Sequence, residues 1–304
     1  GASRLESTLT DPAALGPRLL QRTLAPYARD DIRYIPTLEE SIERLKAANY
    51  AQVTRLYREF LGGATGELTI VGDFDPDACV PLVKQALSGW KAAQPYARIA
   101  SPPPAAVPGS RHVIETPDKA NATYSAGLNL ALRDTDPDYA ALVIGNYILG
   151  SGTLSSRLGV RIRQQEGLSY GVSSGFAASS QDPRATFSIT AICNPQNMAR
   201  LEVCVQEELA RLLKDGITAD ELTKARQGYL EALKVVRSGD PAILGSLAAY
   251  RHLDRTMAWQ TDFEQRINAL TPDAVNGALR RHLDPAKLVV VVAGDFAGKS
   301  RAGL

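Results

Sequence analysis

The sequence predicts an α+β fold with a mainly antiparallel sheet and helices packed on one face of it. Segments with β-branched or aromatic residues at alternating positions occur in adjacent pairs, and helical segments are grouped between these pairs. A last apolar segment near the end of the chain adds a further strand. Single strands alternating regularly with single helices would have favoured a parallel sheet instead.

The length and one proline-rich stretch predict the domain organisation. The 304 residues correspond to about two domains at ~150 residues each. Residues 94–109 contain repeated prolines, which cannot continue a helix or join a central strand, so we expect a linker there. The predicted organisation is therefore 1–93, a linker at 94–109, and a second domain at 110–304. The chain starts without Met, and we expect it to be a piece of a longer protein.

The part before the linker has few elements. A helical pattern covers 38–60, an apolar strand is expected at 68–71, and a helix begins at Pro76 with Asp75 as its N-cap. This is less than a complete domain requires.

The part after the linker has a fuller set of elements. The expected strands are 112–115, 123–130, 169–178, 185–193 and 287–293. Helices are expected where capping residues or proline precede a helical pattern and glycine follows it, at 137–149, 155–166, 195–214, from Thr218 toward Val236, and from Pro272.

A short repeat links the two parts. The apolar strand that ends in Gly72-Asp73-Phe74 recurs as one that ends in Gly294-Asp295-Phe296, and Gly72 and Gly294 are 222 positions apart. An amphipathic helix precedes each copy in the same register. We therefore expect a duplication in which residues 1–93 are the C-terminal part of one domain and 110–304 are a second copy.

Charge and cysteine content exclude several classes of function. Lys+Arg 34 against Asp+Glu 33 leaves a net charge of +1, so no field favours nucleic acid as a partner. No apolar run is long enough for a membrane span. The three cysteines form no C-x-x-C motif, and buried free thiols are the simplest interpretation.

No metal site or nucleophile motif is visible. The three histidines are far apart, and neither H-E-x-x-H nor H-x-x-E-H occurs. The sequence therefore predicts no catalytic residue and no metal ligand in this chain alone.

The helix predicted at 155–166 and the turn after it place two polar side chains near one edge of the sheet. Leu158 and Ile162 continue an apolar stripe from Leu154, and the helix should end at Gly167. Arg163 lies in its last turn, and Tyr170 follows the turn at the start of a strand. From spacing alone, a solvated arginine and a half-buried tyrosine are the simpler interpretation of the pattern.

The stretch from Gly150 to Val172 reads GSGTLSSRLGVRIRQQEGLSYGV. It resembles the second, non-catalytic domain of zinc peptidases of the pitrilysin, insulinase and mitochondrial processing peptidase type. Residues 214–226, KDGITADELTKAR, and the two Gly-Asp-Phe strands are similar to other parts of that family. The resemblance covers most of the chain and implies a duplicated, metallohydrolase-like fold.

The resemblance also implies roles for particular residues. It assigns Arg163 and Tyr170 to the substrate and the transition state, and Gly150 and Gly152 to a loop that could contact substrate. The implied partners are a peptide substrate and a homologous catalytic domain, either upstream in the same chain or on a partner subunit, which holds the zinc. The implied function is the accessory part of a zinc metalloendopeptidase, and a bacterial periplasmic location is compatible with it. The alternative is a non-enzymatic scaffold or peptide-binding module on the same fold.

Overall fold

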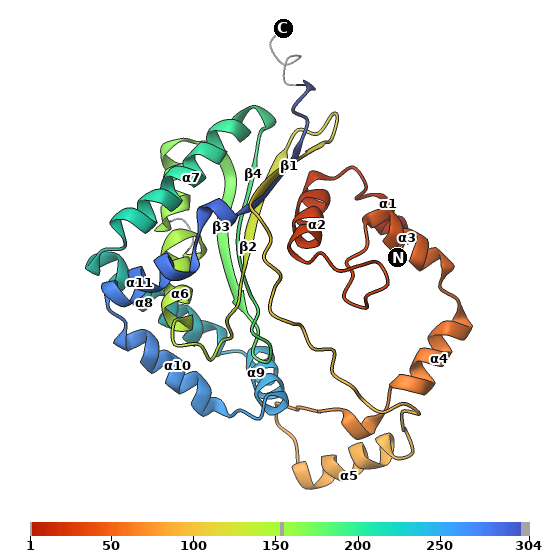
Figure 1. Cartoon of the computed structure of the whole chain (residues 1–304). Coiled ribbons are helices and arrows are strands. Elements are labelled where there is room, and N and C mark those ends of the chain that lie inside the picture. Colours follow the sequence, from red (N-terminus) through yellow and green to blue (C-terminus); the bar gives the residue numbers. More distant parts are fainter. Residues whose placement is uncertain (1, 153–154, 299–304) are drawn as a thin grey trace. The chain divides into compact units, whose positions relative to one another are not determined.

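The computed structural model describes residues 2–152 and 155–298, which form two compact units (Figure 1). Unit 1 contains residues 1–43, 101–229 and 265–304, and unit 2 contains residues 44–100 and 230–264. None of the described helices combines the length and the apolar character needed to cross a bilayer.

Unit 1 is built on one five-stranded sheet. Its strands are β1 (Ser110–Glu115), β2 (Ala122–Leu130), β3 (Ser169–Ala178), β4 (Ala185–Cys193) and β5 (Val289–Gly294). They lie in the order β1-β5-β2-β4-β3, and β1 and β5 are the parallel pair while the other neighbours are antiparallel. The predicted α+β class and its mainly antiparallel sheet are confirmed.

Most helices of unit 1 cover one face of this sheet (Figure 1). They include α6 (Tyr139–Asn146), which continues as the π-helix η2 (Tyr147–Ser151), a second π-helix η4 (Gly159–Gln165), α7 (Met198–Asp215) and α11 (Pro272–His282). The short 3₁₀ turns η5 (Pro195–Asn197) and η6 (Pro285–Lys287) and the first part of α8 (Ala219–Val236) complete the set. The core between sheet and helices is apolar, with Phe187, Leu149 and Leu201 at most 2% exposed.

One helix that the sequence analysis did not single out packs on the opposite face. Helix α2 (Pro12–Leu24) follows α1 (Ala2–Glu6), and its N-cap Asp11 accepts the Ala13 N–H at 2.9 Å. Leu20 and Leu24 pack against Val289 and Val291 of β5. The expectation of helices on one face was therefore incomplete, although Asp-Pro before an apolar pattern is a recognisable helix start.

Alternate residues of β2 face opposite sides of the sheet, and both sides are covered by helices. Thr123 donates its hydroxyl to the Pro12 carbonyl at 2.9 Å, and Asn129 donates to the Leu24 carbonyl at 2.6 Å, so the odd-numbered residues face α2. The even-numbered Tyr124, Ala126 and Leu128 are buried on the other side.

Unit 2 is helical. It contains the end of α3 (Leu38–Ala47), α4 (Tyr50–Phe60), the 3₁₀ turn η1 (Gly63–Thr65), α5 (Pro76–Leu87), the end of α8, α9 (Asp240–His252) and most of α10 (Met257–Ala269). The predicted helix over 38–60 is interrupted, because Asn49 forms a capping box with Gln52 and starts a new helix. The predicted helix from Pro76 is confirmed.

The strand expected at 68–71 is absent, and that prediction was wrong. Leu68 is 63% exposed and Ile70 is 41% exposed. The described residues of unit 2 contain no strand that could pair with this segment, and a strand without a neighbour leaves its backbone groups unpaired.

The local structure nevertheless repeats with the same offset of 222 residues that relates Gly72 to Gly294. N-caps stand at Asn49 and Thr271, helices at α4 and α11, and 3₁₀ turns at η1 and η6. Both caps accept a backbone N–H three residues later, at 3.0 and 3.2 Å.

Candidate functional site

A tight turn joins η4 to the edge strand β3. Glu166 donates its N–H to the Arg161 carbonyl at 3.2 Å, and Leu168 donates to the Ile162 carbonyl at 3.0 Å. Gly167 has φ 63°, the left-handed conformation that glycine adopts without strain. The chain therefore reverses within the three residues 166–168, between the end of η4 and the start of β3.

Arg163 and Tyr170 lie on either side of this turn, and both are exposed. Tyr170 is 68% exposed, and neither side chain makes a hydrogen bond, an ion pair or a ring contact with another described residue. The structure thus places both at one end of the sheet edge without joining them to each other. Their roles toward substrate remain a prediction.

Arg161, in the same helix as Arg163, has a structural role because it forms ion pairs. Arg161 bonds Glu207 at 2.8 Å and pairs with Glu166, which also accepts from Arg200 at 2.6 Å. The hydrogen bond from Arg200, followed by the charges of both arginines, holds the pKa of Glu166 below its ordinary value against the opposing effect of burial. Arg163 takes no part in this network.

A β-bulge exposes Tyr170. The register between β3 and β4 shifts between Ser169 and Gly171, so Tyr170 has no partner residue. The Ser169 hydroxyl holds the bulge, because it donates to the Ile192 carbonyl at 2.7 Å and accepts the Gly171 N–H at 3.1 Å. Bulges of this kind redirect a side chain at the end of a strand.

The two glycines proposed for a substrate loop are buried. A Cβ on Gly150 would lie 2.5 Å from the Ser174 nitrogen, and one on Gly152 would lie 2.7 Å from the Tyr147 carbonyl oxygen. Close packing therefore accounts for glycine at both positions, and their contact with substrate remains a prediction. Leu154, which the sequence analysis included in the apolar stripe, lies outside the described residues, as does Thr153.

A buried ion network beside this loop was not predicted from the sequence. Arg157 bonds Glu221 through two nitrogens at 2.8 and 2.9 Å and donates to the Gly216 carbonyl at 2.7 Å. Its side chain is 11% exposed, and Glu208, 3.9 Å away, is 3% exposed. Arg157 and Glu221 are 64 positions apart in the sequence, so no local pattern could have predicted their contact.

The network fixes the charge of Glu221. Burial alone would raise the pKa of this carboxyl, but the hydrogen bonds from Arg157 and from the Thr218 N–H lower it below the ordinary value. The predicted capping box at Thr218 and Glu221 is present, with the two bonds at 2.8 and 3.2 Å. Arg157 therefore ties the η4 region to the start of α8.

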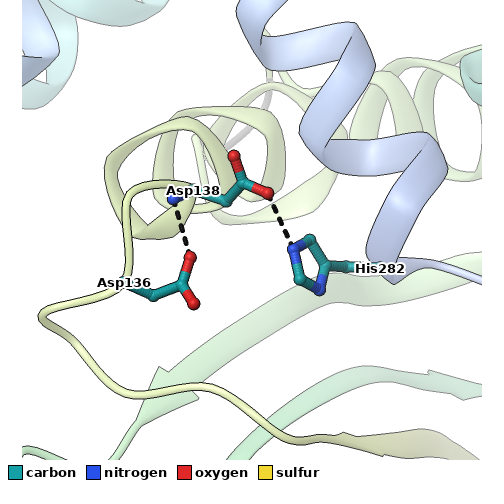
Figure 2. Close-up of side chains that lie close together, drawn as sticks. All are labelled: Asp136, Asp138 and His282. Atoms are coloured by element: carbon teal, nitrogen blue, oxygen red, sulfur yellow. Dashed lines mark hydrogen bonds and ion pairs between the residues drawn. The ribbon is translucent and has the colours of Figure 1, made fainter.

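A second cluster joins the start of α6 to the end of α11 (Figure 2). Asp136, Asp138 and His282 offer three possible ligand atoms within 4.8 Å of one another, an arrangement that the scattered histidines did not suggest. Asp138 already accepts from Arg281 at 2.9 and 2.6 Å and from His282 at 2.9 Å.

Because a guanidinium fork compensates the Asp138 charge, the cluster is an ion-pair network and a poor cation site. The hydrogen bonds from Arg281, and then the bond from His282, hold the pKa of Asp138 below its usual range against burial.

The chain matches a family model described as the peptidase M16 inactive domain over residues 47–229. It belongs to this family. The crystal structure of a peptidase M16 inactive domain from Pseudomonas fluorescens superposes with a TM-score of 0.77 at 26% identity, over 96% of this chain and 68% of that one. The resemblance read from the sequence is therefore confirmed, and the M16 inactive domain fold accounts for the sheet described above.

Two curated relatives of this M16 inactive domain are named zinc proteases. An uncharacterized zinc protease of Streptomyces coelicolor, SCO5738, is 27% identical over 256 residues, which cover 79% of this chain and 52% of that protein. An uncharacterized zinc protease of Bacillus subtilis, YmxG, is 30% identical over 149 residues, 46% of this chain and 34% of that protein. The chain thus spans between a third and about half of these relatives.

The periplasmic protease PqqL from Escherichia coli shares the fold of this inactive domain. Its crystal structure superposes with a TM-score of 0.69 at 21% identity, over 96% of this chain and 32% of that one.

Proposed function

We propose that the chain is the accessory, substrate-positioning part of a zinc metalloendopeptidase that hydrolyses peptides, and that it is inactive alone. Membership of the M16 inactive domain family and the names of the curated relatives support this proposal. The observation that carries it is the pair Arg163 and Tyr170, exposed and without partners among the described residues, at the start of a sheet edge.

The residues that the structure describes do not fit a catalytic zinc ion. Such a site needs three protein ligands with an open fourth position for water. Among the described residues, Asp136, Asp138 and His282 form the cluster of three possible metal ligands. The Asp138 carboxylate already accepts hydrogen bonds from Arg281. We therefore place the zinc in the homologous catalytic partner and derive no step of the reaction through it.

Tyr170 and Arg163 would act on the substrate by different means. A phenol hydroxyl can donate a hydrogen bond to the oxyanion that develops on a scissile carbonyl. A guanidinium donates from a rigid planar fork and can fix peptide carbonyls near the reacting bond. Neither group has to break an existing interaction with a described residue to do so.

The test uses the complete peptidase, with Arg161 as the matched control. We expect Tyr170→Phe to lower kcat by about 10²–10³-fold, because it removes one oxyanion donor and little volume. Arg163→Ala should lower kcat/KM, and Arg163→Lys should rescue little of it. Arg161→Ala should reduce thermal stability, since it breaks two ion pairs, and leave kcat unchanged. Wild-type kinetics for both Arg163→Ala and Tyr170→Phe would instead favour the scaffold function.

The repeat supports a proposal for the surface that faces the homologous partner. In α11 and just after it, Val275, Ala278, Leu279 and Leu283 are 0, 0, 2 and 7% exposed. The residues 222 positions earlier are Val53, Leu56, Tyr57 and Leu61, and these are 59, 57, 51 and 45% exposed.

The same pattern is therefore buried in one copy, where α11 packs mainly on α6, and uncovered in the other. We infer that α4 and residues 68–74 complete a homologous domain that supplies the missing sheet. Within the predicted range 1–93, the repeat supports this assignment for residues 49–74, while α2 packs in unit 1.

Amide exchange tests this surface. Backbone amides of residues 50–60 should exchange at least about tenfold more slowly in the complete peptidase than in the chain alone, because partner packing protects a helix that is otherwise marginal. Leu56→Glu should abolish the difference, whereas Arg58→Glu, on the exposed polar face of the same helix, should keep it. Equal exchange with and without the partner domain would refute the assignment.

A further inference from the structure

The bulge at the start of β3 explains why the Tyr170 ring is exposed. Even-numbered residues of this strand face the helices: the Ser174 hydroxyl donates to the Asn146 carbonyl of α6 at 3.2 Å, and the centre of the Phe176 ring lies 5.9 Å from that of Tyr139. Residues 171, 173 and 177 alternate with them and are exposed. Tyr170 has an even number, yet it is 68% exposed.

One extra residue in β3 accounts for this difference. From Gly171 to Ala178 each residue has a partner in β4, and a continued ladder would pair Tyr170 with Cys193. Ser169 takes Cys193 as its partner instead, so Tyr170 is left over. Without the bulge, the alternation of the strand would direct the phenol toward the helices. The exposed position of Tyr170 therefore depends on the bulge.

The Ser169 side chain holds the bulge from inside the protein. It is 8% exposed, and its hydroxyl oxygen lies 2.7 Å from the Ile192 carbonyl oxygen and 2.8 Å from that of Gly171. One hydroxyl has a single proton, so the two carbonyls share it, while the Gly171 N–H donates to the same oxygen at 3.1 Å. These contacts join both strands at the bulge, and an alanine could supply none of them.

A second side chain holds the turn before the bulge. Asn197 stands at the N-cap of α7 but makes no capping bond to that helix, although asparagine at this position usually does. Its side-chain amide donates to the Leu168 carbonyl at 3.3 Å instead. The residues on both sides of Ser169 are thus tied to the segment 192–197, which joins β4 to α7.

We propose that Ser169 is a positioning residue for Tyr170. Its hydroxyl keeps the bulge formed, and the bulge keeps the phenol exposed, where it can donate to a developing oxyanion. The inference rests on the proposed function, because it names the group that presents this donor. Ser169 itself is buried and already bonded to three backbone groups, so it acts through Tyr170 and not on the substrate. A donor fixed before the reaction stabilises an oxyanion better than one that must reorient.

The first test follows Tyr170 in the chain alone, without metal or turnover. Tetranitromethane nitrates exposed tyrosines, and mass spectrometry of peptides gives the rate at each one. Tyr96, which is 66% exposed, is the internal reference. Ser169→Ala should slow nitration of Tyr170 relative to Tyr96 by about fivefold, the equivalent of one hydrogen bond.

Two further variants control this measurement. Ser174→Ala also removes a buried hydroxyl that donates to a carbonyl, but away from the bulge, and should change the nitration ratio by less than about twofold. Asn197→Ala should slow nitration in the same direction by about threefold, because its bond is longer. Urea unfolding checks that each variant folds, and Asn197→Ala decides the outcome if Ser169→Ala does not.

The second test is a double-mutant cycle in the complete peptidase. Ser169→Ala should lower kcat by about fivefold and change KM by less than about twofold. In a Tyr170→Phe background the same change should cost less than about twofold in kcat, because no hydroxyl is left to position. A merely structural role of Ser169 would lower kcat equally in both backgrounds.

The proposal would be overturned by an unchanged nitration ratio in the folded variants, or by equal losses of kcat in the two backgrounds. The proposed function is judged separately, by the effect of Tyr170→Phe on kcat. Slower nitration of Ser169→Ala together with wild-type kcat for Tyr170→Phe would reject the role of Tyr170 and leave its positioning by Ser169 intact. A lost kcat for Tyr170→Phe with unchanged nitration of Ser169→Ala would reject the positioning role alone.

Discussion

Replacing Arg157 with methionine should destabilise unit 1 by about 2–3 kcal/mol. Breaking a buried ion pair from one side costs ~3–5 kcal/mol, because the remaining charge is left without compensation. Here the loss is moderated, since Glu221 keeps the Thr218 N–H and Glu208 keeps Arg211 at 2.9 Å. The Gly216 carbonyl loses the donor at 2.7 Å as well.

The assay has to report on unit 1 specifically. Both tryptophans, Trp90 and Trp259, belong to unit 2, so fluorescence would follow the wrong part of the chain. Amide exchange of peptides from β2 and β4 at increasing urea gives the free energy of unfolding for the sheet itself. Arg211→Met is the matched control, because Arg211 bonds the same Glu208 but is 57% exposed. Its loss should cost under about 1 kcal/mol.

The effect should also depend on pH in a defined direction. Because the folded-state pKa of Glu221 is lowered, its stabilisation is present above the unfolded pKa near ~4.3 and is lost as pH falls through the folded value. Without Arg157, burial raises that pKa instead, so the difference between wild type and Arg157→Met should shrink below about pH 4. The reasoning is refuted if Arg157→Met costs no more than Arg211→Met, or if the difference grows in acid.

Three other outcomes follow from the structure. Asp138→Asn should destabilise unit 1 by about 1 kcal/mol at neutral pH, and the loss should vanish in acid as Asp138 of the wild type is protonated, which urea titrations at several pH values will show. Arg281→Gln should reproduce most of this loss. Brief proteolysis should cut first within 94–109, and early cuts near Ser173 would contradict the linker prediction. The dialysed chain should hold no stoichiometric zinc by elemental analysis and cleave no peptide, and one tightly held zinc per chain would overturn that expectation.

The sequence predicted most elements of unit 1 because their signals are local. Alternating apolar residues and capping residues determine a strand or a helix within about ten positions, and all five strands of the sheet lie where they were expected. The networks around Arg157 and Asp138 could not be predicted, since their partners are 64 and 143 positions away and only the fold brings them together. The candidate site stands between these cases. The turn at Gly167 can be predicted from the local sequence. That Arg161 has an ion-pair partner in α7 and Arg163 has none among the described residues depends on the position of α7 in the fold.

Two differences between the predicted and the observed elements have opposite physical causes. Helix α2 was overlooked although its start signal is local, and its burial by β5 then stabilises it. Residues 68–71 carry an apolar strand pattern but no strand, because strand formation requires a neighbouring backbone and the described part of unit 2 offers none. The corresponding residues 290–293 lie between β1 and β2 and are strand. The two segments have the same sequence pattern and follow corresponding helices of the repeat. The presence of a sheet beside 290–293 is therefore the difference that explains why only this segment forms a strand. Neighbouring strands from a homologous sheet should therefore convert 68–71 into a strand, as β1 and β2 do for its counterpart in unit 1.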